Sequence, residues 1–333
     1  MSKGPVVIEV TRGPVVESRH EGIAAVVKAD GTVVDSWGDI DAAILPRSAN
    51  KPIQAMAFVE SGAVERFGLG NEHIALACAS HSGEPRHVET VRAWLKKVGL
   101  SEADLECGTH APRLQTSIEA LAREGVLPTA AFNNCSGKHS GFLTTAVTYG
   151  EPTKGYIKYD HPVQRRLREV MSDLCGLDAN AFPHGTDGCG IPTLATPLKR
   201  LAQAMAAMAD PSRLSSKRAD AAQRIRAAMN AEPFMVAGSG RFCTRINEAA
   251  PGVIQVKTGA EGVFCGMLPT LGLGVAIKMW DGAGRASEIA MAALLHHLGV
   301  LPANQREEIL RPPVKNVVGL LVGEMRPAKS WLG

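Results

Sequence analysis

The hydrophobic pattern of this chain changes twice along its length, and this limits its possible folds more than any other feature. Both ends carry short β-branched runs, whereas apolar residues in the middle recur at helical spacing. Near the N-terminus, PVVES and GIAAVVKADGTVVDSWG predict strands, with Asp30 and Gly31 in a tight hairpin turn. Near the C-terminus, GVIQVKTG, GVFCGML and GLGVAIKMW predict three neighbouring antiparallel strands, followed by a helix that ends at Gly299.

Three segments of the middle region predict helices from their 3.6-residue period. They are EPRHVETVRAWLKKVG, DHPVQRRLREVMSDLCG and TPLKRLAQAMAAMAD. Pro162 suits the first turn of the second helix, and Thr196 is the expected N-cap of the third. Met205 and Met208 in the third helix are expected to fill the core rather than to bind a ligand.

These patterns predict an α+β fold, because the strands gather at the two ends of the chain instead of alternating with helices. We expect one antiparallel sheet formed by residues 1–45 and 250–333, flanked by helices, with a mainly helical region over residues 46–249. The chain has neither a long linker rich in Pro, Gly or Ser nor a repeat of fixed period. Residues 1–333 are therefore expected to form a single unit.

The composition excludes several classes of protein. Of the 333 residues, 45% are hydrophobic and 21% are charged, which is typical of a globular chain and not of a disordered one. The net charge of +3 is small and its charges are interleaved, so neither nucleic acid nor a membrane is an expected partner. We find no secretory signal, no apolar run of about 20 residues, and seven cysteines without a close CxxC pair. We therefore expect a soluble cytoplasmic protein with free or metal-bound thiols.

Ser48 is the first candidate for catalysis. It lies in PRSANKP and is the only one of the eighteen serines with a lysine three positions later, Lys51. Residues i and i+3 share a face at the start of a helix, so the Lys51 amine can reach the Ser48 hydroxyl. Desolvation lowers the pKa of an amine, and its neutral form can then accept the hydroxyl proton. The alternative is a surface pair without a catalytic role, which is common for this spacing.

A second serine–lysine pair strengthens the catalytic interpretation of Ser48 and Lys51. Lys257-Thr258-Gly259 is the only KTG in the chain, and it lies on the first of the three C-terminal strands. Serine acyl-enzymes of the β-lactamase and penicillin-binding type combine SxxK on a helix with KTG and an S-x-N element. Here the intervening element is Ser80-His81-Ser82, which matches only in its serine. We expect Ser48/Lys51 and Ser80/Lys257 to meet at one site; alternatively, Ser80 only caps a turn.

The segment FNNCSGKHSG, residues 132–141, allows further chemistries. A phosphate-binding loop is excluded, because Phe132 stands where the first glycine belongs and a histidine follows the lysine. Cys135 with His139 as its base is an alternative nucleophile, although no third group that would orient the histidine is evident.

A zinc site is the other interpretation of this segment. Cys135 and Lys138 have the spacing common at zinc sites, and Cys189 in HGTDGCGIP, near the carboxylate of Asp187, supplies a third ligand. Lysine is an uncommon ligand, because the metal must displace a proton from an amine with a pKa of about 10.4. Buried structural cysteines are the alternative.

Six motifs together resemble one known family. They are PRSANKP, CASHSGEPRH, NNCSGKHSG, HGTDGCGIPT, SGRFCT and VIQVKTGAEG. In this order they resemble the Rhizobium etli-type L-asparaginases along nearly all of the chain. The resemblance implies a fold similar to serine β-lactamases and glutaminases, activity on L-asparagine, a homodimer, and one zinc ion per chain.

The resemblance also implies which residues form the site. They are the catalytic Ser48, Lys51, Ser80 and Lys257; the zinc ligands Cys135, Lys138 and Cys189; and the neighbouring Arg47, His139, Asp187 and Cys243.

We therefore expect hydrolysis by double displacement. Neutral Lys51 accepts the Ser48 proton during attack on the amide, and protonated Lys257 acts through Ser80 on the leaving ammonia. Zinc can polarise its water or anchor the substrate's α-amino or α-carboxylate group, and we favour anchoring. The alternatives are a glutaminase, a β-lactam-type acylhydrolase, and a zinc-stabilised binding protein without turnover.

Overall fold

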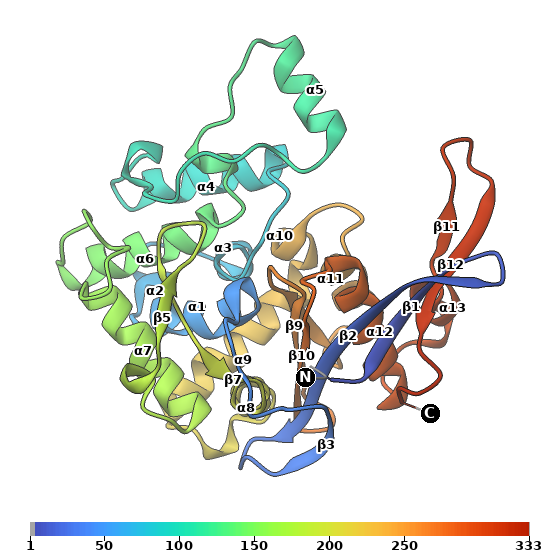
Figure 1. Cartoon of the computed structure of the whole chain (residues 1–333). Coiled ribbons are helices and arrows are strands. Elements are labelled where there is room, and N and C mark those ends of the chain that lie inside the picture. The colour runs from blue at the N-terminus through green and yellow to red at the C-terminus, as the bar shows by residue number, and fades with distance from the viewer. Residues whose placement is uncertain (1–3, 333) are drawn as a thin grey trace.

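Figure 1 shows a computed structural model of the chain, which describes residues 4–332 apart from the side chains of residues 305–307. Its centre is an eight-stranded antiparallel sheet to which both ends of the chain contribute. The strands are β1 (Val6–Arg12), β2 (Val15–Lys28), β3 (Val33–Trp37), β8 (Gln255–Thr258), β9 (Val263–Leu268), β10 (Leu273–Met279), β11 (Pro313–Lys315) and β12 (Leu321–Pro327). Their order is β11-β12-β1-β2-β10-β9-β8, with β3 also paired to β2. The α+β class and the origin of the sheet in both chain ends are confirmed.

Strand β2 joins the two parts of the sheet. Its first half pairs with β1, and residues 22–28 pair with β10. In this second half, Ile23 and Val27 belong to one hydrophobic cluster, whereas Ala24 and Val26 belong to another on the opposite face. Because both faces are buried, this part of the strand is a continuous apolar run.

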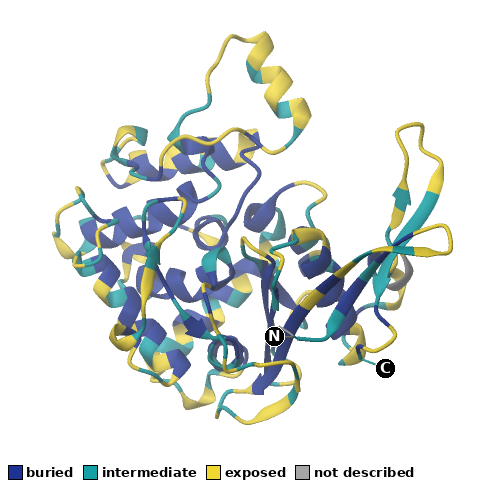
Figure 2. Cartoon of the chain, viewed as in Figure 1, coloured by how far each residue is buried: buried dark blue, intermediate teal, exposed yellow. Residues whose placement is uncertain are grey.

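Helices cover both faces of the sheet, and Figure 2 shows the buried residues concentrated where the layers meet. Helix α8 packs against β2, β9 and β10, whereas α12 packs on the opposite face against β1, β9 and β10. The helices are α1 (Lys51–Glu60), α2 (Ala63–Arg66), α3 (Asn71–Ala77), α4 (Pro85–Lys97), α5 (Gln115–Arg123), α6 (Ser136–Tyr149), α7 (Pro162–Cys175), α8 (Leu198–Ala209), α9 (Ser216–Ala231), α10 (Pro233–Ala237), α11 (Phe242–Ala249), α12 (Gly284–His297) and α13 (Arg306–Leu310). None of the helices in the described part of the chain is long and apolar enough to cross a membrane.

Two segments project from the body of the molecule in Figure 1, namely α5 and the hairpin of β11 and β12. Helix α5 has no buried residue, and Figure 2 shows it largely exposed. The hairpin loop carries Val317 and Val318, which are 105% and 85% exposed. The sequence patterns did not predict these projections, because only part of each segment touches the core: Leu121 of α5 and Met325 of β12 pack against it half-buried.

Most predicted elements are confirmed, but the N-cap Thr196 is wrong. The Asp30–Gly31 turn is closed by a hydrogen bond from Lys28 N to Thr32 O, and Pro162 lies in the first turn of α7. Thr196 instead forms the short strand β7 (Thr196–Pro197), which pairs with β4 (Ala43–Ile44). Helix α8 therefore begins later, after Pro197, without a side-chain cap. The strand pairing replaces the cap that the local sequence suggested.

The close approach of α8 to β10 gives a test of this packing. A Cβ atom on Gly274 would lie 2.0 Å from Ala202 O and 2.2 Å from Ala206 N, both backbone atoms of α8. Gly274→Ala is therefore expected to lower the free energy of unfolding by at least about 2 kcal/mol in urea titrations. Gly185→Ala is the control, because its Cβ atom would contact nothing within 4 Å. Equal stability of the two variants would contradict this packing.

Candidate active site

Ser48 lies in a short 3₁₀ turn, η1 (Arg47–Asn50), that runs directly into α1. Arg47, just before the serine, has a φ of +51°, which is uncommon for a residue other than glycine. Backbone conformations of this kind are concentrated at functional sites. The turn therefore holds a half-buried Ser48 hydroxyl at the N-terminal end of a buried helix.

The KTG strand packs directly against this turn. A Cβ atom on Gly259 would lie 2.8 Å from Pro46 O and 3.1 Å from Ala49 N. Only glycine permits this approach without a shift of the backbone. The glycine of the motif thus brings the end of β8, which carries Lys257, beside the Ser48 turn.

The Lys51 side chain is fully buried and contacts Ser80. Its Nζ lies 2.5 Å from Ala79 O, 3.0 Å from Ser80 Oγ and 3.4 Å from Asn134 O. We predicted a contact with Ser48, but no hydrogen bond within residues 4–332 joins these two side chains. The physical reason is that two carbonyl groups and a hydroxyl match the three N–H groups of a buried ammonium ion.

Lys257 approaches the same hydroxyl from β8. Its Nζ lies 2.8 Å from Ser80 Oγ and donates to Thr258 O at 2.7 Å. Burial, followed by the charge of Lys51, lowers the pKa of Lys257 to about 7. One serine hydroxyl therefore connects a lysine surrounded by three acceptors with a lysine that readily becomes neutral.

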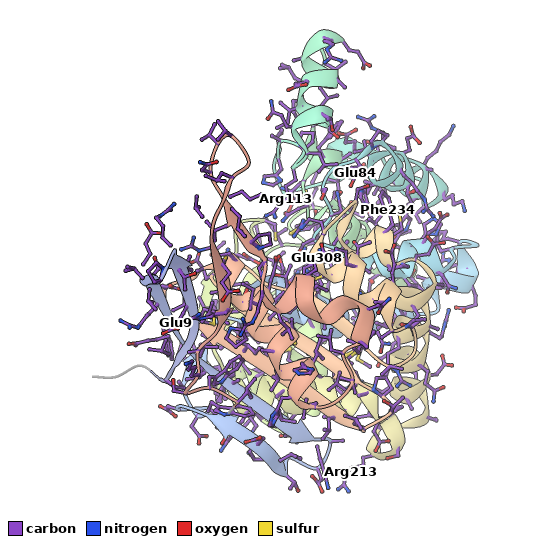
Figure 3. All side chains as sticks on the ribbon, turned by 90° about the vertical axis from the view of Figure 1, so that its right-hand side faces the viewer. Glu9, Glu84, Arg113, Arg213, Phe234 and Glu308 are labelled. Carbon is purple, nitrogen blue, oxygen red and sulfur yellow. The ribbon has the colours of Figure 1, made fainter. Side chains whose placement is uncertain are left out.

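The backbone around Ser80 is fixed by α10. Ser80 N donates to Val236 O at 3.0 Å, and Ser82 Oγ donates to Ala237 O at 2.9 Å. Figure 3 shows Glu84 and Phe234 close together at this junction, where the Phe234 ring stacks on His87 at 4.5 Å. This packing gives the residues of CASHSGEPRH after Ser80 a role in holding that serine in place.

Ser48 and Ser80 line one pocket of about 220 Å³. The other lining residues are Arg113, Asn134, Arg241, Thr258, Gly259, Ala260, Glu261, Gly262, Gly282, Gly284 and Glu288. A groove of about 320 Å³ between α4 and α5 contains neither serine, so we place the chemistry in the smaller pocket. Sequence reasoning missed Arg113, Arg241 and Glu288, although Arg241 lies within the quoted motif SGRFCT; the other two lie outside the six motifs.

Cys243 lies on α11 against the strand that carries Lys257. Its buried Sγ accepts a hydrogen bond from Thr258 N at 3.3 Å. Burial raises the pKa of this thiol. The residue thus supports the KTG strand and is not among those that line the pocket.

The two cysteines and the lysine of the expected zinc site are buried together. Lys138 Nζ lies 3.0 Å from Cys189 Sγ. A hydrogen bond from the Cys135 thiol, with the charge of Lys138, lowers the pKa of Cys189 to about 5. The same hydrogen bond, together with burial, raises the pKa of Cys135 to about 12. The hydrogen bond from Cys135 and the charge of Lys138 therefore favour the thiolate form of Cys189.

Arg47 connects the Ser48 turn to the loop that carries Cys189. Its Nε donates to Asp187 Oδ1 at 2.7 Å, and neither side chain is fully exposed. Burial alone would raise the pKa of Asp187, but Lys138 and Arg47 lower it. The ion pair therefore links the turn of Ser48, the expected nucleophile, to the loop of Cys189, an expected metal ligand.

His139 lies behind the cysteine–lysine cluster. Its Nδ1 is 2.8 Å from Tyr156 Oη, which itself accepts a hydrogen bond from Glu106 N. Burial and Lys138 lower the pKa of His139 well below its ordinary value, so the ring is neutral. Its other nitrogen, Nε2, is buried and has no hydrogen-bond partner in the described part of the chain.

A family match covers nearly all of this structure. The family described as L-asparaginase II matches residues 8–327. The chain belongs to the L-asparaginase II family. No curated protein matches it.

Solved structures with a similar fold resemble this member of the L-asparaginase II family only distantly. Native Mglu is 14% identical, with a TM-score of 0.47, over 85% of this chain and 66% of that chain. A β-lactamase from Mycobacterium bovis is 16% identical, with a TM-score of 0.41, over 83% and 94% of the two chains. Simvastatin synthase from Aspergillus terreus is 10% identical, with a TM-score of 0.39, over 78% and 86%. The chain spans just under two thirds of the native Mglu chain.

The donor set in this L-asparaginase II chain fits a zinc ion. Cys135, Lys138 and Cys189 supply two sulfur atoms and one nitrogen, which are preferred zinc donors, and leave a fourth position open. Two protons must leave, one from Cys135 and one from Lys138, so Zn²⁺ replaces them without a change in net charge. In residues 4–332 no group of three His, Cys, Asp or Glu side chains is placed to hold a metal ion, so a site here would need Lys138 as its third donor.

Lys257→Met is expected to change how stability depends on pH. An unfolded lysine keeps its proton to a pH of about 10.4, whereas folded Lys257 loses it near pH 7. Between these values the unfolded chain binds more protons, so this side chain's contribution to the free energy of unfolding rises with pH. The free energy of unfolding of wild type relative to the variant should therefore rise from about pH 6.5 to about pH 9 in denaturant titrations. A difference independent of pH would contradict the lowered pKa.

Proposed function

We propose that this protein is an L-asparaginase of the Rhizobium etli type. It hydrolyses the side-chain amide of L-asparagine to L-aspartate and ammonia through an acyl-enzyme on Ser48. The observation that carries this proposal is that Ser48 and Ser80 line one pocket while two buried lysine amines meet at Ser80. A nucleophilic hydroxyl next to groups that accept and return a proton is the requirement for acyl transfer.

The hydrogen bonds support a proton relay that starts with charged Lys51. Lys51 gives a proton to Ser80, which passes its own proton to neutral Lys257, so Lys51 becomes a free base. Lys51, which contacts Ser80 in this structure, must then come within hydrogen-bond distance of Ser48 to accept its proton as Ser48 attacks the amide carbon. Backbone N–H groups of the turn stabilise the oxyanion. Protonated Lys257 returns a proton through Ser80 to the leaving ammonia. Water finally hydrolyses the β-aspartyl ester.

Ser48→Ala is expected to abolish ammonia release from L-asparagine, and Lys51→Ala is expected to lower kcat by at least about a hundredfold, because general-base catalysis is lost. The measurement is steady-state ammonia release from L-asparagine and L-glutamine, side by side. Ser212→Ala is the control, because this serine is exposed and does not line the pocket. Turnover that survives Ser48→Ala would contradict the proposed nucleophile.

The same assay separates the alternative functions. Faster release from L-glutamine would identify a glutaminase, and hydrolysis of a chromogenic cephalosporin would identify a β-lactam acylhydrolase. Bound zinc without release of ammonia from any amide would identify a binding protein.

We also propose that Cys135, Lys138 and Cys189 hold one zinc ion per chain, which when bound supplies a Lewis acid beside the pocket. Purified protein is expected to contain about one zinc ion per chain by elemental analysis, and Cys189→Ala to lose it. Cys175→Ala is the control, because this cysteine is also buried but belongs to α7. Retention of zinc by Cys189→Ala would contradict the ligand set. If a chelator abolished turnover while Ser48→Ala remained active, the results would indicate that the metal, and not Ser48, carries out catalysis.

We further propose a homodimer in a reducing, cytoplasmic compartment. All seven cysteines are free and buried, which supports the compartment. The exposed apolar loop of the β11–β12 hairpin supports association of two chains. Light scattering of the purified protein at several concentrations tests the dimer.

A further inference from the structure

Four charged side chains line the pocket beside the two serines, namely Arg113, Arg241, Glu261 and Glu288. Glu261 is exposed in the turn between β8 and β9, whereas Glu288 is half-buried. Arg113 precedes α5 and is labelled in Figure 3, Arg241 is the N-cap residue of α11, and Glu288 lies in the second turn of α12. Backbone bonding fixes the first of these segments, because Arg113 N donates to Ser82 O at 2.8 Å. Separate segments thus bring two cations and two anions to the cavity that contains Ser48, and Glu288 is the more buried of the two carboxylates.

The charges of Arg113, Arg241 and Glu288 are only partly matched within the protein. In residues 4–332, the side chains of Arg113, Arg241 and Glu288 form no hydrogen bond or ion pair, in contrast with Arg47 and Asp187 nearby. Arg113 is exposed, and Arg241 and Glu288 are half-buried. The charge of Arg241, followed by burial, lowers the pKa of Arg113, which shows that the two guanidinium groups repel each other. Burial raises the pKa of Glu288, and the arginines only partly oppose this effect. Binding of a ligand that carries both an anionic and a cationic group is therefore electrostatically favourable in this pocket.

An α-amino acid has this pair of charges on a single carbon atom. Guanidinium groups bind carboxylates in a planar, often bidentate arrangement, and a carboxylate accepts hydrogen bonds from an ammonium group. A pocket of about 220 Å³ is smaller than sites for drug-sized ligands and suits a ligand the size of an amino acid. Charge and size therefore point to the same class of ligand.

We propose that Arg113 and Arg241 bind the α-carboxylate of the substrate and that Glu288 binds its α-ammonium group. This assignment rests on the proposed amidohydrolase function, and it places the side-chain amide toward Ser48. It also replaces zinc as the anchor for these groups, since Cys135, Lys138 and Cys189 do not line the pocket. The charged residues thus determine that the substrate is a free amino acid and not a simple amide or a peptide.

Substrates that lack one charge test each assignment separately. Succinamic acid is asparagine without the α-ammonium group, and 3-aminopropanamide is asparagine without the α-carboxylate. Glu288→Gln should lower kcat/KM for L-asparagine by at least about tenfold, mainly through KM, and change kcat/KM for succinamic acid less than about twofold. Arg113→Gln and Arg241→Gln should affect L-asparagine and succinamic acid in the same way but spare 3-aminopropanamide.

Arg285→Gln is the matched control, because this exposed arginine lies in α12 close to Glu288 but does not line the pocket. Glu288→Asp and the two arginine-to-lysine variants should recover part of the loss. A loss that is equal for all three substrates would overturn the assignment, because it would indicate a structural defect. Wild-type kcat/KM values for the pocket variants with L-asparagine would overturn it as well.

A binding measurement separates failure of this inference from failure of the proposed function. Calorimetry with L-aspartate on the zinc-loaded chain requires no turnover. Glu288→Gln should raise the Kd by at least about tenfold and Arg285→Gln by less than about twofold. If no amide is hydrolysed but Glu288→Gln weakens L-aspartate binding more than Arg285→Gln does, the proposed amidohydrolase function is wrong and the proposed amino-acid site is supported. If hydrolysis is normal but the variants bind L-aspartate like wild type, the amino-acid site fails alone.

Discussion

The central physical constraint of this molecule is the burial of two lysine amines on one serine hydroxyl. Lys51 and Lys257 are 0% and 2% exposed, and both contact Ser80 Oγ. Two adjacent ammonium groups without water repel each other strongly, so one amine must give up its proton easily. The fold maintains this arrangement because α1, the loop that follows α3, and β8 each supply one of the three side chains. A surface pair of the same residues would have no such requirement.

The Ser48 turn is held from two sides. On one side, the close approach at Gly259 brings the KTG strand against the turn. On the other side, the ion pair of Arg47 with Asp187 joins the turn to the loop of Cys189. These contacts hold Arg47 in its unfavourable backbone conformation, since such strain persists only where its surroundings determine it. The expected metal cluster and the serine–lysine site are therefore mechanically connected, even though only the serines line the pocket.

The sequence allowed the sheet, its helical region and the meeting of Ser80 with Lys257 to be predicted, because motifs and periodicity are local signals. It did not predict that Lys51 would contact Ser80 and not Ser48, since this choice depends on the carbonyl groups of Ala79 and Asn134. Thr196 failed as an N-cap because a strand pairing, invisible in the local pattern, took its place. Arg113 and Glu288 could not be found for a similar reason, because isolated charged residues are usual on any surface. Arg241 lies in the motif SGRFCT, but only the fold shows that the three residues share a cavity.

The most direct test of the account is to identify the residue that reacts with the substrate's side-chain carbon. A diazoketone analogue of L-asparagine carries an electrophilic carbon in place of the amide and labels a nucleophile covalently. Peptide mapping by mass spectrometry after inactivation should find one label per chain, on Ser48, and L-aspartate should protect against it. A label on Cys135, Cys243 or any other residue, with Ser48 unmodified, would contradict the account.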